Sequence, residues 1–270
     1  MTGWDKEYEL YKDDYLKLFD EVMQKEQETN IEFLEKSLSK MLGRNVVACA
    51  NGTDALHFSL ISLGIGKGDE VLTTAFSWIS TASVITMTGA TPVFCDINMT
   101  DYHMSFESIK RMYSDKVKAI IYPHLFGNMS DVSKIKQFRY DNAYMRMAFE
   151  WAKLSHCKRK QVGALIVKNR MIISDGYNGT PTGFENECED DNHFTKWYVL
   201  HAKANAILKV ASSSQSCEGA TLYITLSPCR ECSKLIYQSG IKRLVYSKKY
   251  KDESGLKFLK KSGIEIVQLT

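Results

Sequence analysis

The chain of 270 residues is 44% hydrophobic and 25% charged, which is typical of one or two soluble globular domains and excludes a disordered or fibrous protein. Its net charge of +3 is too small to indicate a nucleic-acid coat or a membrane surface. The acidic start, MTGWDKEYEL, lacks the apolar core of a secretory signal, and no apolar run is long enough to cross a bilayer, so we expect a cytoplasmic protein.

The first half of the sequence alternates apolar runs with helical patterns. Residues 5–43 are polar and have the apolar spacing of helices. Short buried strands are expected at four segments, namely 46–50 (VVACA), 70–74, 91–97 and 117–124. Helical patterns separate these runs, at 53–64, 78–89 and 105–113. The alternation predicts an α/β fold with a parallel sheet covered by helices.

The boundary between the two halves contains no Gly-, Ser- or Pro-rich linker. Residues 130–157 keep helical spacing, which indicates one long helix, or two abutting helices, joining the modules near residue 139. We therefore expect domains at 1–138 and 139–270. Residues 1–138 carry 14 Lys and Arg against 19 Asp and Glu, a net of −5, and residues 139–270 carry 21 against 13, a net of +8. The basic half suits a small anionic ligand such as a nucleotide.

The second half begins with a hairpin pattern. Two strand-like runs, 161–168 and 171–178, flank Asn169-Arg170, and an irregular region follows to residue 196. Helices are then expected at 201–213, 229–239 and 254–262, alternating with strands at 221–226, 243–247 and 265–269. This pattern predicts a second α/β layer built on a small sheet.

A histidine and a cysteine pair form the sharpest motif in the sequence. Seven cysteines, an odd number with one C-x-x-C pair, indicate reduced thiols and a metal rather than disulfides. His201, Cys229 and Cys232 each fall where a helix is expected to begin, and Pro228 suits the first turn of such a helix. Zinc held by three protein ligands keeps an open position for chemistry. The alternative is a core histidine beside a redox pair.

The segments around this motif resemble a known family. HAKANAI and SPCRECSKLIYQSGIKRLVY are similar to the zinc-dependent cytidine and deoxycytidylate deaminases, whose pattern is H-x-E followed by P-C-x-x-C. SHCKRKQVGALIVKNRMIISDGYNGTPTG resembles the deoxycytidylate (dCMP) branch, and the likeness covers about residues 140–270. The resemblance implies a mixed five-stranded sheet flanked by helices, Zn²⁺ as cofactor, hydrolysis of dCMP to dUMP, a homo-oligomer, and dCTP and dTTP as regulators.

The resemblance also implies roles for individual residues. It assigns nucleotide binding to five positions, Asn178, Gly179, Thr180, Ala202 and Ser227, although Asn178-Gly179 is also a common turn. Lys158, Arg159 and Lys160 are placed to attract the 5′-phosphate, or else form a solvated surface. Cys157 and Cys188 fall where some relatives hold a second, structural zinc, with His193 as a candidate third ligand, and the alternative is simple buried or partly buried thiols.

The position of the family's glutamate is occupied by Lys203. That glutamate takes a proton from the attacking water and passes it to the base, whereas an ammonium group can donate a proton but cannot accept one. We therefore expect severely impaired deamination, unless another carboxylate such as Glu231 substitutes. The alternatives are a non-catalytic, nucleotide-binding or oligomeric pseudoenzyme and a pyridoxal-phosphate sugar aminotransferase.

The first half has a resemblance of its own. NGTDALHFSLISLGIGKGDEVLTTAFSWISTASVITMTGATPVFCDI is similar to the start of the pyridoxal-phosphate sugar aminotransferases of the DegT family, over about residues 30–138. The resemblance implies that Gly52, Thr53 and Asp54 cradle the cofactor phosphate and that Trp78 stacks on its ring. Segments carrying the family's Schiff-base lysine and pyridine-pairing aspartate have no counterpart, so we expect a truncated module that serves as a remnant, a fusion partner or an oligomerisation surface.

Overall fold

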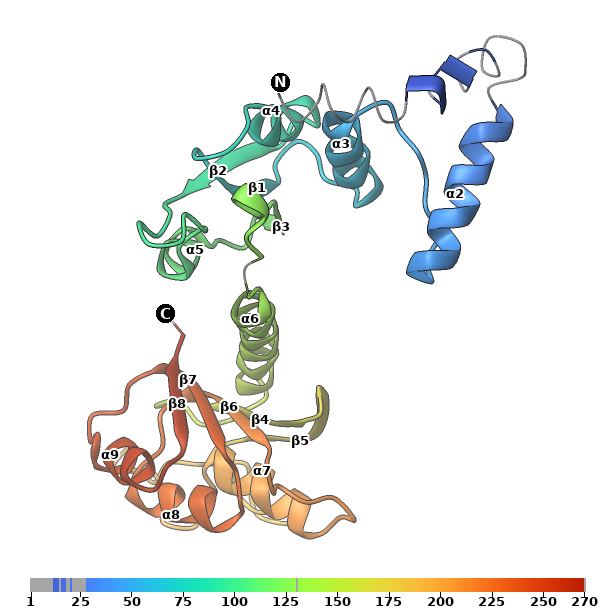
Figure 1. The fold of residues 1–270 in the computed structure, drawn as a ribbon. Helices are drawn as coiled ribbons and strands as arrows, with labels where there is room; N and C mark the ends of the chain where they lie inside the picture. The colour runs from blue at the N-terminus through green and yellow to red at the C-terminus, as the bar shows by residue number, and fades with distance from the viewer. Residues whose placement is uncertain (1–11, 15, 18–19, 21–27, 130, 270) are drawn as a thin grey trace. The chain divides into compact units, whose positions relative to one another are not determined.

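The computed structural model describes residues 12–14, 16–17, 20, 28–129 and 131–269. Contacts divide the chain into two compact units, residues 1–130 and 131–270 (Figure 1). None of the described helices combines the length and apolarity that a bilayer-crossing helix needs.

The first unit contains a three-stranded parallel sheet. Strand β1 (Glu70–Thr74) lies between β2 (Thr91–Cys95) and β3 (Val117–Ile120), in the order β2-β1-β3. Helices α3 (Gly52–Ser62), α4 (Ser80–Met87) and α5 (Phe106–Met112) accompany the strands, and the 3-10 turn η1 (Leu125–Gly127) follows β3. The predicted parallel sheet with helices is confirmed.

Apolar residues of β1 form the centre of this unit. Val71 and Leu72 are fully buried, and Val71 packs in one cluster with Leu60 of α3 and with Val84 of α4. Asn51 caps α3, because its Oδ1 accepts a hydrogen bond from the Asp54 N–H at 2.9 Å.

The expected strand at 46–50 is wrong. After helix α2 (Glu28–Leu42) the chain turns at Gly43 and runs back beside the helix. Side chains of α2 take its N–H groups: Val46 N–H donates to Ser39 Oγ at 2.9 Å and Ala48 N–H to Glu35 Oε1 at 2.7 Å. The run VVACA has the composition of a strand but pairs with side chains of a helix instead. The predicted helical region before Glu28 lies mostly outside the described residues.

The second unit is built on a mixed five-stranded sheet, as predicted. Its strands are β4 (Gly163–Lys168), β5 (Met171–Tyr177), β6 (Thr221–Leu226), β7 (Arg243–Lys248) and β8 (Glu265–Gln268), in the order β5-β4-β6-β7-β8. Strand β4 is antiparallel to β5 and β6, whereas β6, β7 and β8 are parallel. Asn169 and Arg170 both have positive φ angles, as a tight hairpin turn requires.

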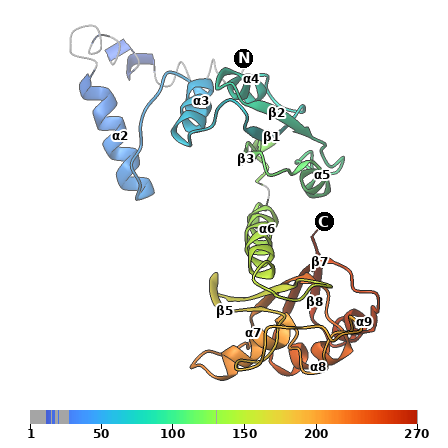
Figure 2. The same cartoon turned by 180° about the vertical axis from the view of Figure 1, so that it is seen from behind.

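Helices cover both faces of this sheet (Figures 1 and 2). Alternate residues of β6 face opposite ways: Tyr223 packs with Met145 and Ala148 of α6 (Ser133–Ala152), and Leu222 packs on the other side. That other side is covered by α7 (Ala202–Ala211), α8 (Arg230–Gln238) and α9 (Ser254–Lys261). Helix α6 passes through residue 139 as a single helix.

Candidate metal and nucleotide site

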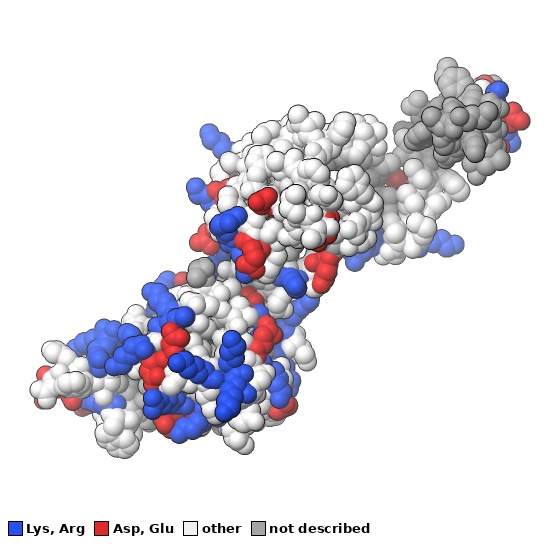
Figure 3. Space-filling model, turned by 60° about the vertical axis from the view of Figure 1, so that its left-hand side comes forward, with Lys and Arg blue, Asp and Glu red and all other residues white. Residues whose placement is uncertain are grey.

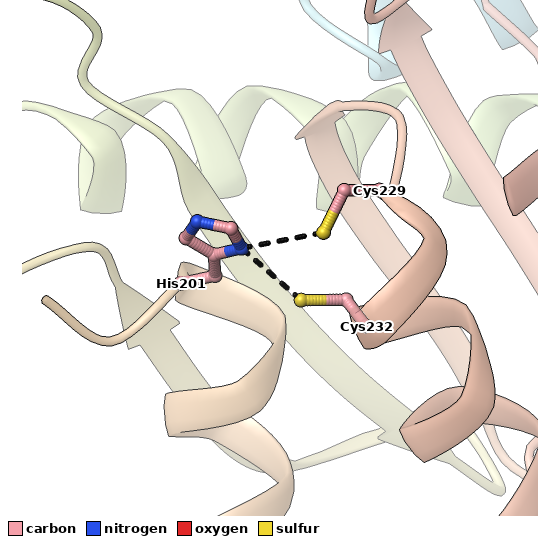
Figure 4. Close-up of side chains that lie close together, drawn as sticks. All are labelled: His201, Cys229 and Cys232. Carbon is pink, nitrogen blue, oxygen red and sulfur yellow. Dashed lines mark hydrogen bonds between the residues drawn. The ribbon is translucent and has the colours of Figure 1, made fainter. Parts of the chain in front are cut away.

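Three side chains converge where α7 and α8 begin. His201 is the N-cap of α7, Cys229 is the N-cap of α8, and Cys232 follows within the first turn of α8 (Figure 4). His201 Nδ1 lies 3.2 Å from Cys232 Sγ and 3.5 Å from Cys229 Sγ. Among the described residues this is the one group of three His, Cys, Asp or Glu side chains whose ligand atoms are close enough to hold a metal ion, all within 4.8 Å.

The donor set fits zinc in type and in spacing. Tetrahedral zinc with Zn–S of about 2.3 Å and Zn–N of about 2.0 Å places nitrogen and sulfur roughly 3.5 Å apart. The observed nitrogen–sulfur distances of 3.2 and 3.5 Å are close to that value. His201 is exposed while Cys232 is buried, so the group is closed on its protein side and open on the other. This is the arrangement expected of a metal site with a free position.

Close packing of α7 against β5 fixes the position of His201. A Cβ atom on Gly176 of β5 would lie 2.3 Å from the Ala202 carbonyl oxygen and 2.7 Å from the Ala206 nitrogen. Ser174 Oγ donates to the Ala206 carbonyl at 2.8 Å, and Asn205 Nδ2 donates to the Tyr177 carbonyl at 3.1 Å. Gly176 therefore allows the helix to lie directly on the strand, and the hydrogen bonds hold it there.

Lys203 lies on the buried face of α7 beside the two thiols. Its side chain is 5% exposed, and burial lowers the pKa of its ammonium group, while the charges of Cys232 and Cys229 act to raise that pKa. No Asp or Glu forms an ion pair with it among the described residues. The hydrogen bond between the two thiols lowers the pKa of Cys229 and raises that of Cys232, so the pair tends to carry one negative charge. Lys203 is therefore an amine buried next to sulfur ligands, in an environment that favours its neutral form.

A cavity of about 250 Å³ opens beside this group. The metal-site residues His201 and Cys229 line it together with Lys203. Of the five residues assigned to nucleotide binding, the structure brings three to the cavity wall, namely Asn178, Ala202 and Ser227. Gly179 and Thr180 are not among its lining residues: the main chain of Gly179 pairs with Leu200, and the Thr180 hydroxyl is buried without a hydrogen-bond partner among the described residues.

The side-chain amide of Asn178 fixes one wall of the cavity. Its Oδ1 accepts from the Val162 N–H at 2.7 Å, and its Nδ2 donates to the Lys160 carbonyl at 2.8 Å. Ser227, which also lines the cavity, accepts at Oγ from the Tyr250 N–H at 2.8 Å. Two of the predicted binding residues thus also hold loops in place.

Basic side chains gather at the mouth of the cavity. Arg159, Lys160 and Lys251 line the cavity, together with Tyr250. The Lys160 ammonium lies 5.7 Å from the centre of the Tyr250 ring, close enough for a cation–π contact. Figure 3 shows many Lys and Arg side chains on one face of this unit. Sequence reasoning named Lys158, Arg159 and Lys160 but missed Tyr250, Lys251 and Glu189, which belong to no recognisable motif.

The remaining predicted metal and catalytic candidates are placed as follows. Cys157 and Cys188 are both buried, and burial together with a hydrogen bond between their thiols raises the pKa of Cys188 to about 12. His193 forms no group of three metal-ligating side chains with them among the residues that the structure describes. Glu231 is exposed, is ion-paired with Lys234, and does not line the cavity.

The candidate cofactor site of the first unit lies at the start of α3. Gly52, Thr53 and Asp54 form the first turn, whose Asp54 N–H is occupied by the Asn51 side chain. The Trp78 side chain is 77% exposed. The structure thus has an open surface at Trp78.

Comparisons with known proteins match the two halves separately. Residues 11–143 match the DegT/DnrJ/EryC1/StrS aminotransferase family, and residues 139–248 match the cytidine and deoxycytidylate deaminase zinc-binding region. A pleiotropic regulatory protein of Geobacillus stearothermophilus is 34% identical to this chain over the matched residues. The match covers 50% of this chain but only 37% of the length of that relative. The dCMP deaminase from cyanophage S-TIM5, whose crystal structure in complex with dCMP and dUMP is known, is 42% identical in sequence to this chain. The structural match has a TM-score of 0.47 and covers 52% of this chain and 98% of the cyanophage chain.

A third relative decides the family. The deoxycytidylate deaminase of Enterobacteria phage T4 is 35% identical, and the match covers 45% of this chain and 86% of the phage protein. The chain therefore belongs to the cytidine and deoxycytidylate deaminase family.

Proposed function

We propose that this protein is a zinc-dependent deaminase of dCMP whose turnover is severely impaired by Lys203. The relatives named deoxycytidylate deaminase support the reaction and the substrate. The observation that carries the impairment is the burial of Lys203 in the wall of the cavity, two residues from His201, where the family pattern has a glutamate.

His201 Nδ1, Cys229 Sγ and Cys232 Sγ would hold the zinc ion. The chemistry that zinc supplies in such a site is the polarisation of a water molecule, which makes it nucleophilic near neutral pH. The exposed side of His201 leaves room for that water and for the base. Asn178, Ala202 and Ser227 would surround the nucleotide from the cavity wall.

The phosphate of the nucleotide would lie at the basic mouth. Arg159, Lys160 and Lys251 all line the cavity, so an anion there would meet cations from two separate segments of the chain. A charge of this kind favours a nucleotide over an uncharged nucleoside. Lys158 is exposed beside these residues and would add to the positive potential.

Lys203 can perform only half of the proton transfer that deamination needs. The reaction needs a group that accepts a proton from water and then delivers it to the pyrimidine ring and the leaving amine. A charged ammonium donates but does not accept. Loss of a general acid–base costs about 10²–10⁴ in rate, which at about 1.4 kcal/mol per decade is roughly 3–6 kcal/mol of barrier.

Ammonia release from dCMP tests this proposal directly. Purified protein loaded with zinc is compared with the Lys203→Glu variant, which restores the acid–base group, and with Lys203→Gln, which removes the charge but restores no base. We expect Lys203→Glu to raise turnover by about 10²-fold or more and Lys203→Gln to stay near the wild-type rate.

Two results would contradict the impairment. Equal turnover for wild type and Lys203→Glu would mean that another group carries the proton. Equal rescue by both variants would mean that the charge of Lys203, rather than the missing base, limits the reaction. Binding of dCMP by the wild-type protein, measured by calorimetry, separates an impaired enzyme from a protein that lacks the nucleotide site altogether.

A further inference from the structure

The carboxylate of Glu189 occupies an anion-binding position at the cavity. Its Oε2 accepts a hydrogen bond from the Lys158 N–H, and its Oε1 accepts one from the Arg159 N–H, each at 3.2 Å. Two successive main-chain N–H groups that converge on one point form a binding site for an anion. Glu189 lines the same cavity as His201 and Lys203.

The side chains near this carboxylate are the basic ones expected around a bound phosphate group. Arg159, Lys160 and Lys251 line the cavity around it. None of these cations forms an ion pair with Glu189 among the described residues, and Arg159 instead reaches Thr195, with Nη1 3.4 Å from the hydroxyl oxygen. The charge of Glu189 is therefore met by the main chain, while the nearby cations remain available to a second anion.

Both partners of this contact are fixed by their own hydrogen bonds. Glu189 lies on a short hairpin, which is closed by the bond from the Lys196 N–H to the Cys188 carbonyl at 2.8 Å and by the bridge between Glu189 and Thr195. The segment after Arg159 is held by the Asn178 amide, through Lys160 and Val162. Rotation of the Glu189 side chain alone would expose the two N–H groups.

We propose that Glu189 is a specificity-determining residue that occupies the phosphate subsite in the absence of ligand and is displaced by the phosphate of the bound nucleotide. This inference rests on the proposed function for the identity of the nucleotide. A phosphate monoester carries close to two negative charges and three acceptor oxygens, against one charge and two oxygens for a carboxylate. The bonds of 3.2 Å to Glu189 are also longer than the roughly 2.7–2.9 Å of strong charge-assisted bonds.

Displacement makes the cavity selective. A nucleoside has no group that can replace the carboxylate. The two N–H groups therefore stay bonded to Glu189 and contribute nothing to the binding of the nucleoside. A phosphate-bearing ligand forms hydrogen bonds with the two N–H groups and ion pairs with the cations. Its apparent affinity is nevertheless lower than its intrinsic affinity, because it can bind only the fraction of protein in which Glu189 has left the subsite.

The test measures binding of inorganic phosphate, dCMP and deoxycytidine by calorimetry. Wild type is compared with Glu189→Gln and Glu189→Ala, and with Glu187→Gln as the matched control. Glu187 is 71% exposed, approaches Lys196 at 3.9 Å, and loses the same charge without touching the N–H groups. We expect both Glu189 variants to bind phosphate and dCMP about 3–10-fold more tightly, with deoxycytidine unchanged and Glu187→Gln near wild type.

Weaker or unchanged phosphate binding in both Glu189 variants would overturn the proposal, because it would make Glu189 a support for the loop. An equal gain in Glu187→Gln would overturn it too, since net charge alone would then be responsible. The phosphate measurement does not depend on the base. A gain for phosphate without any dCMP binding would leave the subsite standing and contradict the proposed function.

Discussion

At the scale of single residues, the site is defined by its charges. Two thiolates balance the charge of a zinc ion, and a glutamate at the third position of H-x-E would leave the centre with one net negative charge. A protonated Lys203 would change that sum to one net positive charge. The Lys203 amine is buried and has no carboxylate partner among the described residues, and burial lowers its pKa, so the environment opposes that positive charge.

The chemistry of Lys203 could be predicted from the sequence, but its environment could not. The motif placed Lys203 two residues after His201, and this alone indicates a missing base. Its 5% exposure depends on the approach of α7 to β5, which Gly176 permits through contacts between residues far apart in sequence. Glu189 escaped prediction for a similar reason, because its partners Lys158 and Arg159 lie about 30 positions earlier in the chain.

At the scale of elements, a buried ion pair ties α6 to the sheet of the second unit. Asp141 of α6 accepts from Arg243 Nη1 at 2.8 Å and Nη2 at 2.7 Å, and from the Tyr223 hydroxyl at 2.8 Å. Arg243 also donates to Glu265 at 2.8 Å, which links β7 to β8. These carboxylate bonds raise the pKa of Arg243 against the opposing effect of burial.

We expect Asp141→Asn to lower the free energy of unfolding of this unit by about 3–5 kcal/mol, because it removes the buried carboxylate and leaves the Arg243 guanidinium with only the exposed carboxylate of Glu265. Asp175→Asn is the matched control: Asp175 pairs with Lys209 at 2.7 Å, but the side chains are 35% and 48% exposed. Its loss should cost about 1 kcal/mol or less. Urea denaturation at neutral pH measures both, and similar small losses would contradict a structural role for the buried pair.

The prediction of strands was correct where the predicted segment pairs with neighbouring strands in the folded sheet. The strands 70–74 and 221–226 were predicted with the bounds that the structure has, because each is a short segment rich in β-branched residues that is buried along most of its length. The run at 46–50 is more apolar than either, yet it forms hydrogen bonds with Ser39 and Glu35 of α2. Composition indicates that a segment can form a strand, and only long-range pairing decides whether it does.

At the scale of the whole molecule, both units leave large apolar side chains exposed, the second unit among others Trp197 at 93% and Phe194 at 65%. The first unit has a sheet of three strands and several exposed apolar side chains, among them Phe33 at 73%, Trp78 at 77% and Phe126 at 86%. Figure 3 shows a largely uncharged surface on this unit. Exposed apolar area of this kind marks a surface for association.

We therefore expect the full chain to self-associate through the first unit. Size-exclusion chromatography with light scattering should give at least twice the mass of one chain, and Trp78→Ser should shift the equilibrium toward the single chain. A monodisperse single chain at micromolar concentration for the wild-type protein would contradict this expectation.

The zinc content of the purified protein tests the central claim most directly. Elemental analysis of the wild-type chain is compared with that of Cys229→Ser, which removes one sulfur ligand and leaves the rest of the cavity unchanged. We expect at least one zinc ion per wild-type chain and the loss of about one in the variant. The same zinc content in both proteins, or none in either, would contradict a metal centre at His201, Cys229 and Cys232.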